Sequence, residues 1–493
     1  MAPDSHWLMG HLLRTSQGEF RNRQRRLFSS VPNAFGQTGC WYGPQRAVAV
    51  TSLSDARKVL SAEYYRARPG IANKHMSMFL GSRNIGCMKG REWKFHHSWA
   101  LKAMSHTALQ HHKVAMKDVC ERVVDSILEQ KALRGGARWM VNVEDISKMI
   151  TLDIFGFAGL GIDFECTKRL KVSKEAQAFD ILSEELGKRI QSPLWLPNCF
   201  YSIPTERNRT HSRARSHLRA LLKRTLQERR IKNRTEPPEQ DLLGAMLVAL
   251  DANKELIYGE DDNEEQFEQM ISDMMITLMF AGYDTTSITL TYALYLVSQH
   301  PEVEQRCREE IRVSNPEDCA YCKGVIFEAL RMFPPGTLIY RTIQKSIVLD
   351  GGFIVPRDAH VLIPIWLIQN TEENFPRPEE FHPERWVRRN EASKADEPLW
   401  VDRNEDDRTL SSSSIPPANR RAFFAFSAGG RSCPGYKFAI QEAGIALSTL
   451  LRELKFTVVP EYDLRPSRKG IVQGPLGGMP MFVERINSNR AKT

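Results

Sequence analysis

Phe426-Ser-Ala-Gly-Gly-Arg-Ser-Cys-Pro-Gly435 is the most informative stretch of the sequence, and an amphipathic run over residues 436–454 follows it. Gly429 lets the loop backbone approach a flat group closely, because glycine has no side chain. Arg431 can pair with a carboxylate through two parallel hydrogen bonds. Cys433 lies just before the expected helix, where the positive end of the helix dipole favours the thiolate, the form of cysteine that binds metals. The stretch therefore predicts a cysteine loop that binds a metal.

This arrangement resembles the cysteine-ligand loop of the cytochrome P450 family, whose pattern F-x-x-G-x-R-x-C-x-G is matched at every specified position. A single isolated cysteine would more often be a small buried hydrophobic residue. The resemblance implies that Cys433 is the proximal thiolate on a haem iron, that Arg431 holds a haem propionate and that Phe426 packs near the ligand sulfur. It also implies that Gly429 and Gly435 help to bind the haem.

A second motif, Glu328-Ala-Leu-Arg331, places an acid and a base three residues apart on one helical face. Alone, this pair would be an ordinary surface ion pair that adds little to the free energy of folding. Phe381-His-Pro-Glu-Arg-Trp386 follows, however, where the family pattern requires it. The resemblance implies that Arg385 joins Glu328 and Arg331 in a buried charge network beneath the haem loop, with a structural role.

The third motif lies in a long, nearly uncharged segment, residues 274–299, whose only charged side chain is Asp284. The segment is long enough to span a bilayer, but its many threonines and the central charge favour a buried helix inside a domain. Its sequence Ala281-Gly-Tyr-Asp-Thr-Thr286 resembles the oxygen-activation pattern of the family. The resemblance implies that Ala281 and Thr285 face the haem, and that Asp284 and Thr285 are catalytic because they hold and relay protons. A threonine-rich core helix is the alternative interpretation.

The fourth motif is an imperfect match. Gly90-Arg-Glu-Trp-Lys-Phe-His-His97 resembles the helix that reaches the haem propionates, where the family often has tryptophan and, four residues later, arginine. Trp93 is in place, but His97 occupies the arginine position, so we expect a weaker or pH-dependent propionate contact there. His96 and His97 make a poor metal site, because adjacent residues on a helix point in different directions.

The nine cysteines are an odd number scattered along the chain, unlike the dense even set of a secreted disulfide scaffold, so a reducing compartment is expected. Cys319-Ala-Tyr-Cys322 has the spacing of a redox or metal motif. No second pair or downstream histidine cluster completes a zinc site, and we expect ordinary thiols there.

The composition indicates a globular protein. The chain has 493 residues, of which 42% are hydrophobic and 26% charged. Its net charge of +9 favours an acidic partner or a membrane surface but is too diffuse to indicate nucleic acid binding. An acidic residue and two histidines within residues 1–11 break any signal-peptide core, so we expect no N-terminal anchor.

Apolar spacing predicts a mainly helical fold with a minor β region. The helices are expected at residues 100–128, 141–155, 176–191 and 212–231, in addition to the two segments above, and the region 207–234 should present a solvated basic face. A hairpin is expected at 346–355 with Asp350-Gly351 at its turn, and an extended run at 361–367. The resemblance implies one α+β P450-like domain over residues 11–486 that encloses haem, with a flexible insertion at 388–421 and tails at 1–10 and 487–493.

The resemblance also implies the activity: a monooxygenase that inserts one atom of O2 into an apolar organic substrate such as a lipid, sterol or terpenoid. The cofactor would be haem b, reduced by NADPH through a separate flavoprotein reductase or by a ferredoxin, since only a short segment follows Cys433. A haem-thiolate isomerase or dehydratase, and a non-catalytic haem-binding protein, remain open. We expect an intracellular location, with peripheral membrane contact at the endoplasmic reticulum or another organelle left open.

By the same resemblance, the substrate pocket is expected to draw on four segments, residues 71–88, 194–203, 336–339 and 472–481. Their large side chains indicate an apolar ligand: Met76, Met78, Phe79, Trp195, Leu338 and Met479.

Overall fold

The computed structural model describes residues 36–42, 45–62, 65–66, 76–133, 139–190, 201, 203–237, 239–253, 264–389, 396–399, 419–469 and 471–486. Residues 1–35, both expected tails, Trp195 and positions 390–395 and 400–418 of the expected insertion lie outside this part. No helix in the described part is long and apolar enough to cross a bilayer.

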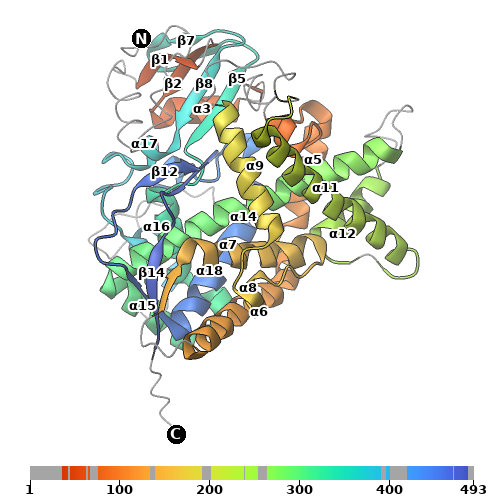
Figure 1. Ribbon diagram of the computed structural model, residues 1–493. Helices are drawn as coiled ribbons and strands as arrows, with labels where there is room; N and C mark the ends of the chain where they lie inside the picture. The colour runs from red at the N-terminus through yellow and green to blue at the C-terminus, as the bar shows by residue number, and fades with distance from the viewer. Residues whose placement is uncertain are drawn as a thin grey trace.

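Helices make up most of the described chain, as the apolar spacing predicted (Figure 1). The α-helices are α3 (Leu53–Ser61), α5 (Gly90–Ala103), α6 (His106–Leu133), α7 (Val143–Phe155), α8 (Cys166–Arg169), α9 (Lys174–Ile190), α11 (Glu206–Lys232), α12 (Leu242–Asp251), α14 (Glu264–Gln299), α15 (Pro301–Val313), α16 (Ala320–Met332), α17 (Ile365–Gln369) and α18 (Tyr436–Glu453). Short helices of other types are η1 (Gly156–Leu160), η2 (Pro316–Asp318), η3 (Asp350–Gly352), η4 (Pro383–Trp386), η5 (Arg420–Ala422) and η6 (Gly429–Arg431).

The largest sheet lies at one end of the molecule, at the top of Figure 1. Its order is β1 (Gln37–Tyr42), β2 (Gln45–Val50), β8 (His360–Pro364), β5 (Leu338–Ile343) and β3 (Tyr65–Arg66). A second sheet pairs β11 (Leu454–Val458), β14 (Pro480–Arg485) and β4 (Trp139–Asn142). Three strand pairs complete the list: β6 (Ile347–Val348) with β7 (Ile354–Val355), β9 (Val387–Arg389) with β10 (Asp396–Pro398), and β12 (Pro466–Lys469) with β13 (Val472–Pro475).

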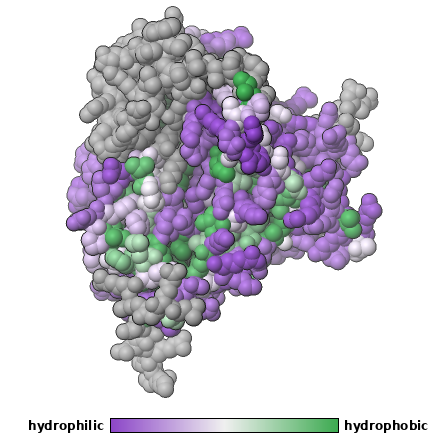
Figure 2. Space-filling view, viewed as in Figure 1, coloured by the Kyte–Doolittle hydropathy of each residue, from purple (hydrophilic) through white to green (hydrophobic). Residues whose placement is uncertain are grey.

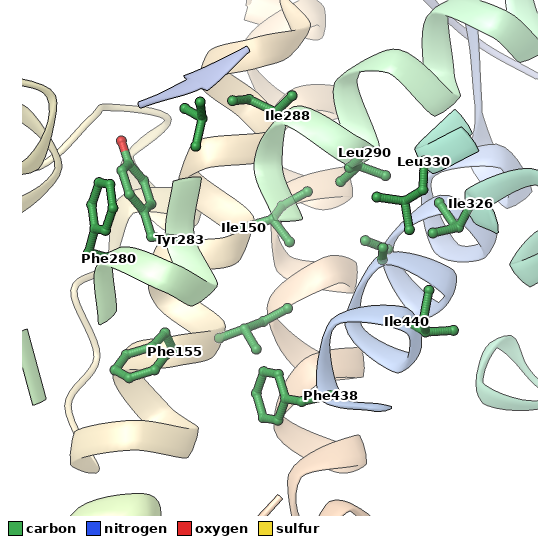
Figure 3. Packing of buried hydrophobic residues seen from close by; sticks show 14 of the residues in the cluster. Ile150, Phe155, Phe280, Tyr283, Ile288, Leu290, Ile326, Leu330, Phe438 and Ile440 are labelled. Carbon is green, nitrogen blue, oxygen red and sulfur yellow. The ribbon is translucent and has the colours of Figure 1, made fainter. Parts of the chain in front are cut away.

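Helix α14 forms the centre of the helical part, where it packs against α7, α11, α16 and α18. Most of its side chains are buried, including Asp284 near its middle, which confirms a buried helix. Figure 3 shows Leu290 of α14 beside Leu330 and Ile326 of α16 and Ile440 of α18. Each buried aliphatic side chain of this size contributes about 1.5–3 kcal/mol relative to an exposed one, so this core holds α14 firmly against α18.

Three sequence expectations were wrong in detail. The helix expected at 100–128 is interrupted after Ala103, because Met104 leaves helical geometry and the Ser105 side chain accepts the amide of Ala108 to start α6. The strand expected at 361–367 ends at Pro364, whose missing N–H cannot extend the ladder, and α17 begins there. Residues 141 and 142, expected to start a helix, belong instead to β4 (Trp139–Asn142), and α7 begins at Val143.

The expected hairpin at 346–355 is confirmed as β6 and β7 with η3 at its turn. Within the expected insertion at 388–421, the described residues 388–389 and 396–398 belong to β9 and β10, which pair antiparallel. Arg306 fixes this pair through an ion pair of 2.6 Å to the nearly buried carboxylate of Asp396.

Helix α11 presents the predicted solvated basic face. Its buried side chains form one stripe, and its outward arginines pair with acids, as Arg213 does with Glu206 at 2.6 Å. Figure 2 shows that the visible face over α11 and α12 is mainly hydrophilic.

Candidate functional site

A cavity of about 380 Å³ lies between the middle of α14, the loop that carries Cys433, and the start of α18. Ala281, Gly282 and Thr285 border it from α14, while Phe426 and Cys433 border it from the loop. Most of the other described residues around it are apolar, among them Phe155 and Phe438, which Figure 3 shows on α7 and α18. The two motifs that lie far apart in the sequence therefore share one cavity.

The cysteine loop is held by backbone contacts. The amide of Cys433 donates to the carbonyl of Phe426 at 2.9 Å, which closes the loop on itself. Gly429 has a φ of +70°, and a Cβ there would lie 2.0 Å from the carbonyl oxygen of Leu60 in α3. Only glycine fits this position. The close approach differs from our expectation: Gly429 packs against α3 and does not border the cavity. Gly435, by contrast, borders the cavity and precedes α18.

Arg431 lies where the cavity meets α5. Its guanidinium sits 4.0 Å from the ring centroid of Trp93 and donates to the carbonyl of Met88 at 3.2 Å. His97 packs on the same tryptophan at 4.9 Å between ring centroids, and its Nε2 donates to the carbonyl of Ser432 at 3.0 Å. A carbonyl oxygen can only accept, so Nε2 carries a hydrogen. The structure thus brings Trp93, His97 and Arg431 together, although only Arg431 borders the cavity.

The α14 motif divides between two sides of the helix. Ala281 and Thr285 both border the cavity, and the Thr285 hydroxyl donates to the carbonyl of Ala281 at 2.6 Å. Asp284 is buried and does not border the cavity. Its charge acts on Lys148 of α7: burial opposes the ammonium, but Asp180, Glu144 and Asp284 outweigh it and raise the pKa of Lys148.

Sequence reasoning missed Glu442 of α18. Its carboxyl group is fully buried and lies beside Thr286, which borders the cavity. Burial raises the pKa of Glu442 well above its usual range, with Thr286 as the smaller opposing influence. Burial therefore favours the neutral, protonated form of this carboxyl group. The signal was an acidic residue within the alanine-rich face of the 436–454 run.

The charge network below the loop has the expected members. Glu328 accepts from Arg331 at 2.9 Å through both carboxylate oxygens, from Arg385 Nε at 3.2 Å and from the indole of Trp386 at 2.8 Å. All three charged side chains are fully buried. Burial favours the neutral carboxyl, but Arg331 and Arg385 outweigh it and hold the pKa of Glu328 below its usual range.

The expected pocket segments contribute unevenly. Gly336, Leu338 and Ile339 border the cavity, as does Ile85. Other expected contributors do not border it: Met76, Met78, Phe79 and Met479. Phe79 packs edge-on against Phe280 of α14 at 4.9 Å. Met479 is fully buried. Its amide donates to the side-chain oxygen of Asn142 and its carbonyl accepts the amide of Val143, both at 2.8 Å, because residues 472–481 belong to strands and the turn between them.

A model of the cytochrome P450 family matches residues 1–482, which is nearly the whole chain. The chain belongs to the cytochrome P450 family. Leukotriene-B4 omega-hydroxylase 3 of Mus musculus is 26% identical over 99% of this chain and 89% of its own length. Cyclooctat-9-en-7-ol 5-monooxygenase of Streptomyces melanosporofaciens is 26% identical over 93% and 90%. Cytokinin hydroxylase of Arabidopsis thaliana is 26% identical over 86% and 77%. This P450 is an oxidoreductase that incorporates molecular oxygen.

The cavity of this P450 fits the haem-thiolate cofactor of its family. Among the described residues that border it, Arg431 and Cys433 are the only ionisable ones. A thiol that binds iron and an arginine that pairs with carboxylates are the donors that an iron porphyrin with propionate groups requires. Ala281, with only a methyl group, and Gly282, with no side chain, leave space on the α14 wall of the cavity.

Proposed function

We propose that this chain inserts one atom of O2 into an apolar organic substrate of lipid, sterol or terpenoid type, within a single domain at residues 11–486. The carrying observation is the shared cavity, which has the Cys433 thiol on one wall and the Thr285 hydroxyl on another. Haem b, when bound, supplies the redox chemistry that activates oxygen. Electrons reach it from a separate NADPH-dependent flavoprotein reductase or from a ferredoxin.

The residues of the loop and of α5 hold the cofactor in this proposal. Cys433 is the iron ligand, and Arg431 pairs with a propionate. Trp93 supports the guanidinium of Arg431 from below at 4.0 Å. His97 fixes the loop through the Ser432 carbonyl, so its contribution to propionate binding is indirect. Phe426 and Gly435 shape the wall around the thiolate.

In this proposal, residues of α14 hold protons and relay them to the cavity. Thr285 is the hydroxyl at the cavity wall, one residue after the buried Asp284. Asp284 lies close enough to Lys148 of α7 to interact with it electrostatically, so in this proposal the acid is held behind the cavity wall. The side chains of Glu328, Arg331 and Arg385 have no contact with the cavity and act only by fixing α16 beneath the loop.

The substrate class rests on the cavity lining and on the relatives. Ile85, Phe155, Leu338 and Ile339 offer only hydrocarbon surface. Relatives whose names specify a leukotriene, a cyclooctatenol and pentalenene act on molecules that are largely hydrocarbon. No disulfide joins any of the eight described cysteines to another, which supports an intracellular, reducing location. Peripheral membrane contact would bring apolar substrates to the cavity.

The test is the difference spectrum of the dithionite-reduced protein with carbon monoxide, followed by turnover with a reductase, NADPH and a panel of fatty acids, sterols and terpenes. A long-wavelength Soret band and an oxygenated product support the proposal. A short-wavelength band in the folded protein refutes the thiolate assignment. Rearrangement of a hydroperoxide without reductase identifies an isomerase or dehydratase instead. If the haem is reduced but no substrate of the panel is converted to product, the protein binds haem without catalysing a reaction.

A further inference from the structure

Two thiols and one carboxylate meet where α15 faces the start of α16, outside the haem cavity, and a third thiol lies beside one of them. Cys307 and Glu310 lie three residues apart on α15. Cys319 is the residue before α16, and Cys322 lies in its first turn. Residues three apart share one face of a helix, so α15 and the segment that starts α16 each present two donors on one side. Sequence spacing alone associated only the second pair.

The donors are close enough to share one ion. The sulfur atoms of Cys319 and Cys322 and a carboxylate oxygen of Glu310 lie within 4.8 Å of one another. The thiol of Cys307 interacts directly with that of Cys322. In a tetrahedral zinc site, Zn–S bonds of about 2.3 Å place neighbouring sulfurs roughly 3.8 Å apart. The three donors Glu310, Cys319 and Cys322 are therefore compact enough to share one ion, and Cys307, beside Cys322, is the side chain that would turn in to complete the set.

The surroundings suit such an ion. All three cysteines are fully buried, while Glu310 is partly exposed and gives access from solvent. The Glu310 carboxylate accepts the amides of Tyr321 at 2.8 Å and Cys322 at 3.0 Å, which fixes it above the first turn of α16. A carboxylate has lone pairs left for a metal after two such bonds.

Positive charge offsets the negative charge of this ligand set. The ammonium of Lys323 is near enough to interact electrostatically with both Cys319 and Glu310. The start of α16 adds the positive end of its dipole. Three sulfurs and a carboxylate in a buried site match the ligand preference of zinc rather than that of magnesium or calcium.

We propose that Cys307, Cys319, Cys322 and Glu310 bind one Zn²⁺ ion, which ties α15 to α16. The four protein ligands leave no open position, so the site is structural. It is independent of the proposed oxygenase activity. Because α16 carries Glu328 and Arg331 in its last turns, the ion would anchor the helix end opposite to the buried charge network.

The experiment measures zinc and iron in the full-length holoprotein after incubation with Zn²⁺ and dialysis against a weak chelator. We expect about one zinc ion per chain, and a zinc absorption spectrum with about three sulfur neighbours near 2.3 Å. Cys319→Ser and Cys322→Ser should each lower zinc content at least tenfold. Cys40→Ser changes a buried thiol in β1 and should retain zinc fully. Haem content and far-ultraviolet circular dichroism establish that each variant is folded.

Several outcomes overturn the proposal. Wild-type protein that keeps less than about a tenth of an equivalent of zinc has no such site. A zinc absorption spectrum of the wild-type protein that shows only nitrogen and oxygen neighbours places the ion at another site. This outcome needs no variant. Equal zinc in the Cys319→Ser, Cys322→Ser and Cys40→Ser proteins does the same. A disulfide between Cys319 and Cys322 in the freshly isolated protein assigns the pair to redox chemistry instead.

Discussion

Glu328→Gln tests the buried charge network at nearly constant side-chain volume. The substitution removes the only acid that faces Arg331 and Arg385 in the described network, and one acceptor oxygen becomes an amide that faces donors. Breaking a buried pair in this way costs about 3–5 kcal/mol, because uncompensated charge stays out of water. The flanking cations hold the pKa of Glu328 below its usual range, so the contribution is present at neutral pH and declines only as the pH falls through that lowered pKa.

The measurement is the free energy of unfolding in guanidinium chloride at pH 7, followed by far-ultraviolet circular dichroism. Glu380→Gln is the matched control, because Glu380 pairs with Arg377 on the surface at 3.3 Å and water screens that pair. We expect a large fall in the denaturation midpoint for Glu328→Gln and almost none for the control. A loss of less than about 1 kcal/mol at Glu328 would refute the reasoning, since neither buried arginine would then depend on its carboxylate.

Four other predictions concern the cavity and its supports. Cys433→Ser should abolish the long-wavelength Soret band of the reduced carbon monoxide complex while Cys40→Ser keeps it; a persistent band would mean another iron ligand. Thr285→Ala should raise hydrogen peroxide released per NADPH several-fold, and unchanged coupling would remove Thr285 from proton delivery. Gly429→Ala should lower haem content, because its methyl group would lie 2.0 Å from a carbonyl oxygen. Burial lowers the pKa of His96 to about 4, so the unfolded chain binds this proton more tightly than the folded protein does. The free energy of unfolding is therefore highest at neutral pH and decreases as the pH falls from about 6.5 toward 4. Between pH 7 and pH 5 this costs about 2 kcal/mol, which a His96→Phe variant should not lose in parallel urea titrations.

The elements with a strong local pattern were predictable from the sequence. The Cys433 loop, the helix after it and the buried α14 each depend on residues that are close together in the chain, so their motifs determine them. The cavity contacts of Ala281 and Thr285 followed from their spacing of four. The buried network of Glu328, Arg331 and Arg385 was predictable only through the family resemblance, because a pair three residues apart does not indicate burial.

Contacts between distant segments were not predictable. Strand β4 pairs with β14 from the other end of the chain, and no pattern in residues 139–142 signals that partner. The same reason hid the approach of Glu310 to Cys319 and of Cys307 to Cys322. It also hid the position of Asp284, which interacts electrostatically with Lys148 of α7 and does not border the cavity.

The contact between Gly429 and Leu60 has a consequence for biosynthesis. Leu60 is made early and Gly429 late, so the support for the cysteine loop exists only when most of the chain has left the ribosome. Closing so long a loop is slow compared with forming local helices. The support for the Cys433 loop is therefore completed late in folding, and a cofactor that this loop holds would be fixed in place only after these two distant segments have met.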